Sequence, residues 1–174
     1  MTPRTIFLRL LSAIVLAVVG SGVLPANLFY FLFSPLTVYL SYGLLSLVHG
    51  SVTLDGHVIM VGSQAVELIP ACVAASAYLL LALLILLTRG ISLRKGMLMF
   101  VVGSVLILIA NVLRIEILTS LLLTKQVNYF ETLHLLIWKV MSSAYVVVVW
   151  IVLCKLFSVK TIPVYSDLQH LIKK

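Results

Sequence analysis

The stretch Val66–Thr88, "VELIPACVAASAYLLLALLILLT", begins with polar residues and then remains apolar almost to its end. A helix that crosses a membrane needs about 20 mostly apolar residues, and residues 69–88 meet that requirement. Pro70 suits the first turn of a helix, because the N–H that proline lacks has no partner there. The stretch therefore predicts a membrane helix over 69–88, with Cys72 in its first turn and Glu67 just before it.

Composition places the whole chain in the membrane class. Of its 174 residues, 63% are hydrophobic and only 10% are charged, which is too much apolar surface for a water-soluble domain to bury. The net charge of +7 comes mainly from basic residues between and after apolar runs, where lipid headgroups and topology account for them. We expect one domain over 1–174 and no nucleic-acid partner.

Five apolar segments are long enough to span, at about 5–24, 28–48, 69–88, 96–123 and 132–154. The first looks like a signal peptide, and we interpret it as a retained helix. Ser34 and Pro35 interrupt the second, which favours a kinked or partly re-entrant helix. The residues "TLDGHVIMV", Thr53–Val61, carry an Asp-Gly turn signal and predict a hairpin on the membrane surface. The expected fold is all-α and polytopic, with about five transmembrane helices and a short extracytoplasmic β-hairpin between helices 2 and 3.

Lysine and arginine set the orientation of membrane helices, because basic loops stay in the cytoplasm. The residues that decide it here are Arg89, Arg94, Lys95, Lys155, Lys160, Lys173 and Lys174. They predict a cytoplasmic loop after the third helix and a cytoplasmic tail, which puts Cys72 on the outer side. Five helices then place the N-terminus outside, whereas Arg4 and Arg9 favour the cytoplasm. Either this weaker signal is overridden or one of the first two segments does not span.

Ionisable groups in membrane segments cost about 2.5–3.5 kcal/mol on insertion scales and are therefore candidates for function. Arg114 lies in the outward half of the fourth helix, with Asn111 three residues earlier on the same face. His134 lies in the first turn of the fifth helix, three residues after Glu131. In the predicted topology Cys72, Arg114 and His134 reach one level near the outer membrane face.

Each of these residues also has a structural explanation. Cysteine is often a small buried hydrophobe, and arginine at a helix end can extend to headgroups. His134 can be a surface or capping residue, and Asn111 can bond to a neighbouring helix. Glu67 and Glu131 can be ordinary first-turn acids that complement a helix dipole. The common depth of Cys72, Arg114 and His134 favours a functional interpretation. This depth follows from the predicted topology, which rests on lysines and arginines elsewhere in the chain and not on the three residues themselves.

Together these side chains fit acyl transfer. A thiolate is the attacking form of cysteine, and a helix N-terminus or a nearby cation lowers its pKa. His134 could take the thiol proton and return it to the leaving amine. Arg114 could donate to the oxyanion of the tetrahedral intermediate. The three residues would suffice for peptide-bond cleavage through a thioester.

The order of "VELIPAC", Val66–Cys72, then "NVLRI", Asn111–Ile115, then His134 resembles the exosortase and archaeosortase family over about residues 64–155. Members of that family are multi-spanning membrane cysteine proteases and transpeptidases. The resemblance implies that Cys72, Arg114 and His134 are catalytic. The family usually has a small hydroxyl residue and a glycine just after the cysteine, where this chain has Val73 and Ala74.

The resemblance also implies partners. Substrates would be secreted proteins with a C-terminal motif, a membrane helix and a basic tail, and a lipid or envelope amine would accept the cleaved protein. Asn111, Glu67 and Glu131 would support the catalytic residues. The protein would be a multi-pass cell-membrane protein that needs no cofactor, with its site toward the extracytoplasmic face.

Two other functions stay open. The protein could be an intramembrane cysteine protease without an acceptor. It could also be a small transporter or substrate-binding subunit, in which Arg114, Glu116, His134 and Lys139 line a polar path. A zinc site built from Cys72, His134, His57 and Glu67 is disfavoured, because no two of them have a local ligand spacing.

Three remaining residues have simpler interpretations. Cys154 lies in a different apolar segment from Cys72, so the two cysteines are not expected to pair. We interpret His49 and His57 as interfacial residues of the hairpin region.

Overall fold

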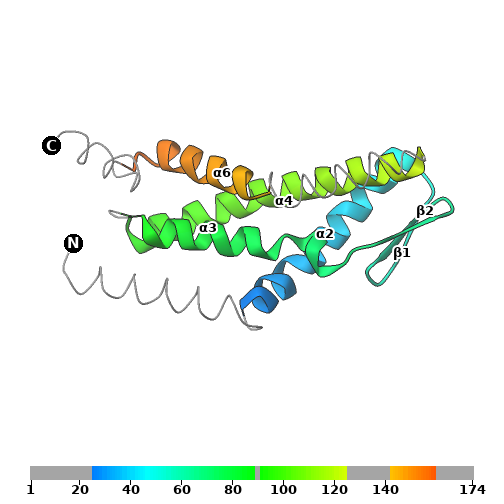
Figure 1. The fold of residues 1–174 in the computed structure, drawn as a ribbon, viewed down its shortest axis with the longest axis horizontal. Coiled ribbons are helices and arrows are strands. Elements are labelled where there is room, and N and C mark those ends of the chain that lie inside the picture. The colour runs from blue at the N-terminus through cyan, green and yellow to red at the C-terminus, as the bar shows by residue number, and fades with distance from the viewer. Residues whose placement is uncertain (1–24, 89–90, 125–141, 160–174) are drawn as a thin grey trace.

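The computed structural model describes residues 25–88, 91–124 and 142–159. Its elements are α2 (Pro25–His49), β1 (Val52–Asp55), β2 (Val58–Val61), β3 (Gln64–Glu67), the 3-10 turn η1 (Pro70–Val73), α3 (Ala75–Leu87), α4 (Leu93–Leu123) and α6 (Ser142–Leu156). Helices α3, α4 and α6 follow the long axis of the molecule, α2 crosses them obliquely, and the sheet lies at one end (Figure 1). The predicted segment 5–24 and the first part of the segment 132–154 lie outside the described residues.

The exposed side of α4 is apolar, whereas a helix on the surface of a soluble protein exposes polar residues, and several polar side chains of α4 are buried. Exposed apolar residues recur at every fourth position of this helix: Met97, Val101, Val105, Ile109, Leu113 and Ile117. Ser104, Asn111 and Arg114 are buried on the other side. Residues Leu28–His49 and Leu93–Leu123 form two helices long and apolar enough to cross a membrane. The described part is thus mostly helical and suited to a membrane, while the five-helix topology stays a prediction.

Helix α2 continues through Ser34 and Pro35, where the sequence suggested an interruption. Its small hydroxyl residues Ser34, Thr37 and Ser41 are all buried. They recur three and four residues apart and therefore share one face of the helix. This face packs inward, while Phe31 and Leu47 are exposed. The predicted re-entrant segment is therefore wrong, and α2 is a single helix.

The predicted hairpin is present, but it is part of a three-stranded antiparallel sheet in the order β1-β2-β3. Two-residue loops connect the strands, with Asp55 paired to Val58 and Val61 paired to Gln64. Each loop begins with a glycine at positive φ, Gly56 at 59° and Gly62 at 60°. A glycine in this position is typical of the type II′ turns that match the twist of a hairpin. The prediction of a single hairpin missed β3.

The sheet is attached to the ends of α2 and α4 by its inner face. Ile59 and Val61 of β2 are buried in a cluster with Leu45 of α2 and Ile115 of α4. Cys72 packs against the same cluster. The sheet therefore lies beside the C-terminal halves of both long helices, next to the cysteine.

The predicted helix over 69–88 is divided in two. Ala74 has φ 56° and ψ 36°, which is left-handed, and it separates η1 from α3. Helix α3 has 13 residues. At 1.5 Å per residue it is about 20 Å long, whereas the hydrocarbon core is about 30 Å thick. Cys72 therefore lies in η1, before the first residue of α3, and not in the first turn of a long membrane helix.

Side chains of α3 and α6 pack closely against α4 at Gly103. A Cβ atom at this position would lie 2.6 Å from Cδ2 of Leu81 and 2.9 Å from Cδ1 of Leu153. Both leucines are completely buried in the main core, which also holds Tyr78 and Met99. A larger residue there would force these two leucine side chains to shift within the core.

Candidate active site

Asn111 attaches the cysteine turn to α4. Its Nδ2 donates a hydrogen bond to the backbone carbonyl oxygen of Cys72 at 2.6 Å, and the Asn111 side chain is only 5% exposed. Within the turn, the N–H of Cys72 donates to the carbonyl oxygen of Ile69 at 2.8 Å. Both groups of the Cys72 backbone are therefore bonded, and the thiol is held in a defined position against α4.

Arg114 follows Asn111 by three residues and shares its face of α4. The residue is 8% exposed, and its guanidinium lies close enough to the Cys72 thiol to act on the thiol by charge and hydrogen bonding. Its Nε and Nη2 atoms are buried and have no hydrogen-bond partner among the described residues. Unpaired buried donors are costly, so a guanidinium with free N–H groups beside a thiol is typical of a site that binds an oxygen atom of a ligand.

The electrostatic state of Cys72 differs from the prediction based on a helix dipole. Cys72 lies outside the long helices, where burial raises the pKa of its thiol. The charge of Arg114, a hydrogen bond from the Ile69 backbone to the thiol and one from Arg114 to the thiol all oppose this rise without cancelling it. The thiol therefore holds its proton more strongly than an ordinary cysteine, and a base that removes the proton would make it able to attack.

A cavity of about 310 Å³ lies next to this pair, between α3, α4 and α6. Most of its lining is apolar, and Ala74, Ala77 and Ala110 keep it open because they are small. Asn111 and Arg114 also line it and provide its strongest polar groups. The cavity therefore combines space for an apolar ligand with an arginine beside a thiol.

The other predicted site residues do not join this group within the described chain. Glu67 is the last residue of β3, and its exposed carboxylate has no ion-pair partner among the described residues. His134, Glu131 and Lys139 lie outside the described residues. The structure thus brings Cys72, Asn111 and Arg114 together. The predicted base, His134, lies outside the described residues. Cys72 and Cys154 are both free thiols, and Cys154 is buried in the main core.

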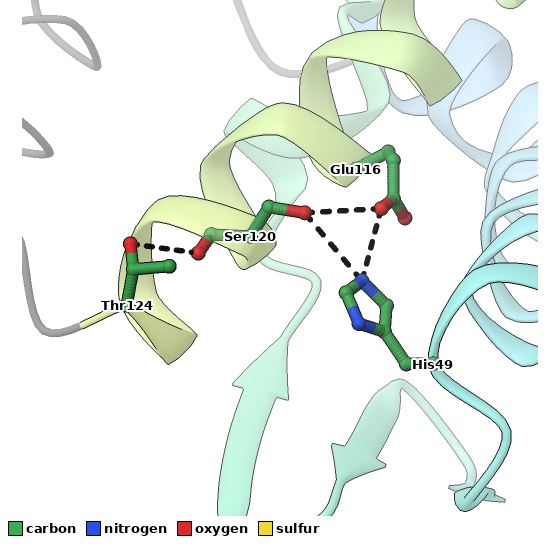
Figure 2. A network of polar contacts seen from close by, with 4 residues as sticks. All are labelled: His49, Glu116, Ser120 and Thr124. Atoms are coloured by element: carbon green, nitrogen blue, oxygen red, sulfur yellow. Dashed lines mark hydrogen bonds and ion pairs between the residues drawn. The ribbon is translucent and has the colours of Figure 1, made fainter.

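A second polar group, which the sequence analysis did not identify, joins α2 to α4 (Figure 2). Nε2 of His49 lies 2.9 Å from Oε1 of Glu116, and Ser120 Oγ donates to the same oxygen at 3.1 Å. His49 is the last residue of α2 and does not belong to the hairpin. The four-residue spacing of Glu116 and Ser120 places them on one face of α4, which was the available sequence signal.

This group does not have the geometry of a Ser-His-acid triad. In a triad the acid contacts Nδ1 of the histidine and the serine contacts Nε2. Here Glu116 Oε1 and Ser120 Oγ both approach Nε2 of His49, at 2.9 and 3.5 Å. The group is therefore a polar contact between two helix ends. Glu116 therefore contacts His49, whereas Arg114 acts on Cys72.

Comparisons of the chain with protein-family models, curated proteins and solved structures give no match. The interpretation of the site therefore rests on the chemistry of its own residues. Among the described residues, no three histidine, cysteine or acidic side chains are placed to hold a metal ion. The described chemistry at Cys72 is that of a thiol, a guanidinium and an amide.

Proposed function

We propose that this protein is a membrane-embedded cysteine transpeptidase. It cleaves the C-terminal sorting signal of secreted proteins and transfers them to a lipid or envelope amine, as the resemblance to exosortases and archaeosortases implies. The observation that carries the proposal is that the Arg114 guanidinium acts on the Cys72 thiol by charge and hydrogen bonding, while Nε and Nη2 of the arginine have no partner among the described residues. A structural cysteine would not need a guanidinium beside its thiol, and an arginine that only binds lipid headgroups would not need to be buried beside a cysteine.

The reaction follows from these groups. A base takes the proton from the Cys72 thiol, and the resemblance assigns this role to His134. The sulfur attacks the carbonyl carbon of the substrate, and Arg114 donates to the oxyanion that forms. The C–N bond then breaks, the base gives its proton to the leaving amine, and the acyl part of the substrate stays bound to the Cys72 sulfur as a thioester. An acceptor amine attacks the thioester, loses a proton and frees the thiol.

The position of Arg114 along α4 supports a site near one membrane surface. Helix α4 begins at Leu93, beside Arg94 and Lys95. About 20 residues cross the hydrocarbon core, so Arg114 lies near the surface opposite to these basic residues. If Arg94 and Lys95 are cytoplasmic, the Cys72 turn lies at the extracytoplasmic face. A bond just outside the membrane helix of a substrate would then lie at the depth of Cys72.

The test is co-expression with a secreted protein that carries a C-terminal membrane helix and a basic tail. Wild type is compared with Cys72→Ala, Arg114→Ala and His134→Ala, and Cys154→Ala is the matched cysteine control. Accumulation of full-length substrate in the first three variants, with normal processing in the control, would support the proposal. Equal processing in all of them would contradict it.

The new C-terminus of the product separates the two protease functions. Mass spectrometry should find it joined to an amine if the protein is a transpeptidase. A bare carboxylate in every product would instead show hydrolysis without an acceptor.

A further inference from the structure

Strand β3 is an edge strand. Of the backbone groups that it directs outward, the carbonyl oxygen of Glu67 accepts from the N–H of Ile69 at 3.2 Å, and the N–H groups have no backbone partner among the described residues. The N–H of Leu68 donates to the carbonyl oxygen of His57 at 2.9 Å, so this pair is hydrogen-bonded. Hydrogen-bonded and non-bonded pairs alternate along antiparallel strands. The pairings of β3 with β2 therefore direct the backbone N–H groups of Ala65 and Glu67 away from β2.

Of the features that usually protect a sheet edge from further pairing, β3 has two, its length of four residues and the exposed charge of Glu67. Proteins also block edges with lysine, proline, bulges or a covering element. Strand β3 reads Gln-Ala-Val-Glu, without lysine or proline, and its register with β2 is continuous. Gln64, Ala65 and Glu67 are exposed, whereas α2 packs on β1 and β2. The described residues thus leave the edge of β3 accessible to another strand.

The same strand leads directly to the thiol. Leu68 is buried in the cluster that holds the sheet to α2 and α4, and η1 follows with Cys72. Because Leu68 is anchored and the backbone of Cys72 is bonded to Asn111, β3 and the thiol are held at a fixed separation. A peptide that pairs with β3 would therefore be guided to Cys72 by a rigid connection.

We propose that the outer edge of β3 binds the segment of the substrate that precedes its membrane helix, in extended conformation, by strand addition. This inference rests on the proposed function, which supplies a substrate with such a segment. The chain runs from β3 through η1 into the apolar helix α3, and the substrate also runs from its recognition segment into a membrane helix. The added strand is therefore parallel to β3. Main-chain hydrogen bonds provide affinity, and alternate side chains provide specificity.

Disulfide trapping tests the geometry. The enzyme carries Cys72→Ser and Cys154→Ala, so that substrate stays uncleaved, together with Ala65→Cys on the edge. Single cysteines are placed at successive positions of the substrate segment, and cross-links are detected on non-reducing gels. Strand addition predicts cross-links at every second position, because side chains alternate between two faces.

Thr53→Cys, which is exposed on β1, is the matched control and should not cross-link. Uniform cross-linking, or none at Ala65→Cys, would overturn the inference.

A kinetic test examines the hydrogen bond itself. Ala65→Pro removes an outward N–H, and proline is tolerated where the N–H of an edge strand faces solvent. We expect the substrate KM to rise about three- to tenfold, which corresponds to the loss of one hydrogen bond. The kcat and the alkylation rate of Cys72 should not change. Ala65→Ser keeps the N–H and should retain the wild-type KM.

The two proposals fail in different ways. If Cys72→Ala leaves processing unchanged, the proposed function is wrong. If Cys72 is required while Ala65→Pro keeps a wild-type KM, only strand addition is wrong.

Discussion

The side chain of Asn111 and the backbone of Cys72 are joined by a hydrogen bond, from Nδ2 to the carbonyl oxygen, at 2.6 Å. This bond connects the cysteine turn to the helix that carries Arg114, three residues farther along. Because it uses the backbone of Cys72, the thiol remains free to interact with the guanidinium. The position of the thiol relative to Arg114 is thus determined by a residue that has no direct part in the proposed chemistry.

Replacing Asn111 by alanine should therefore release the turn. The buried carbonyl of Cys72 would lose its partner, and we expect the free energy of unfolding to fall by about 1–2 kcal/mol. Ser104→Ala is the control, because Ser104 is also buried on α4 but its hydroxyl has no partner among the described residues. Thermal unfolding in detergent measures both variants. An Asn111→Ala protein as stable as Ser104→Ala would contradict a supporting role for this hydrogen bond.

Arg114 should control the reactivity of Cys72. Burial raises the pKa of the thiol, and Arg114 opposes this rise, so Arg114→Gln should raise the pKa further. Because the thiolate reacts, the midpoint of a plot of alkylation rate against pH should move to higher pH in the variant. Arg114→Lys keeps the charge and should move the midpoint less. A midpoint that moves to lower pH in Arg114→Gln, or does not move, would show that the guanidinium does not stabilise the thiolate.

Ala74 should be replaceable by glycine with a gain in stability. Its φ of 56° is left-handed, which costs a residue with a Cβ atom about 1–2 kcal/mol. We expect Ala74→Gly to raise the unfolding free energy by about 1 kcal/mol. Ala77→Gly, in the regular part of α3, should lower it by a similar amount. Chemical or thermal unfolding distinguishes the two, and equal effects from both substitutions would argue against the left-handed conformation.

The elements that depend on local pattern could be predicted from the sequence. Apolar length indicated the long helices α2 and α4, and the Asp55-Gly56 turn indicated the first hairpin. The turn at Gly62-Ser63 carries an equally good hairpin signal. It was missed because the residues after it were interpreted only as the polar approach to a membrane helix.

Other features depend on contacts or conformations that no local pattern contains. Alanine rarely adopts positive φ, so nothing in Ala74 itself predicts the break between η1 and α3. The contact of His49 with Glu116 joins residues 67 positions apart, so it depends on how α2 crosses α4. The bond from Asn111 to the Cys72 backbone has no sequence signal, because any backbone carbonyl can accept it.

His49 and Glu116 should be energetically coupled. Their side chains are 19% and 14% exposed, so solvent screens the pair only in part. In a double-mutant cycle with His49→Ala and Glu116→Ala, we expect a coupling free energy of about 0.5–2 kcal/mol. The cycle of His49→Ala with Thr119→Ala is the control, because the Thr119 hydroxyl has no partner among the described residues. Additive effects in the first cycle would mean that the contact does not hold α2 to α4.

Two glycines with opposite surroundings test the packing of the bundle. Gly103→Ala would place a methyl group against Leu81 and Leu153, which are buried and cannot move away freely. Overpacking of this kind costs about 1–3 kcal/mol, and we expect Gly103→Ala to lower stability by that amount. Gly43 lies in α2, where a Cβ atom would meet nothing within 4 Å. Gly43→Ala should therefore be neutral or stabilise the protein by up to about 1 kcal/mol, because alanine favours the helix. Thermal unfolding of both variants in the same detergent gives the comparison. If Gly103→Ala were as stable as Gly43→Ala, helices α3, α4 and α6 could not be as close as the structure has them, and the walls of the cavity beside Arg114 would have to be placed differently.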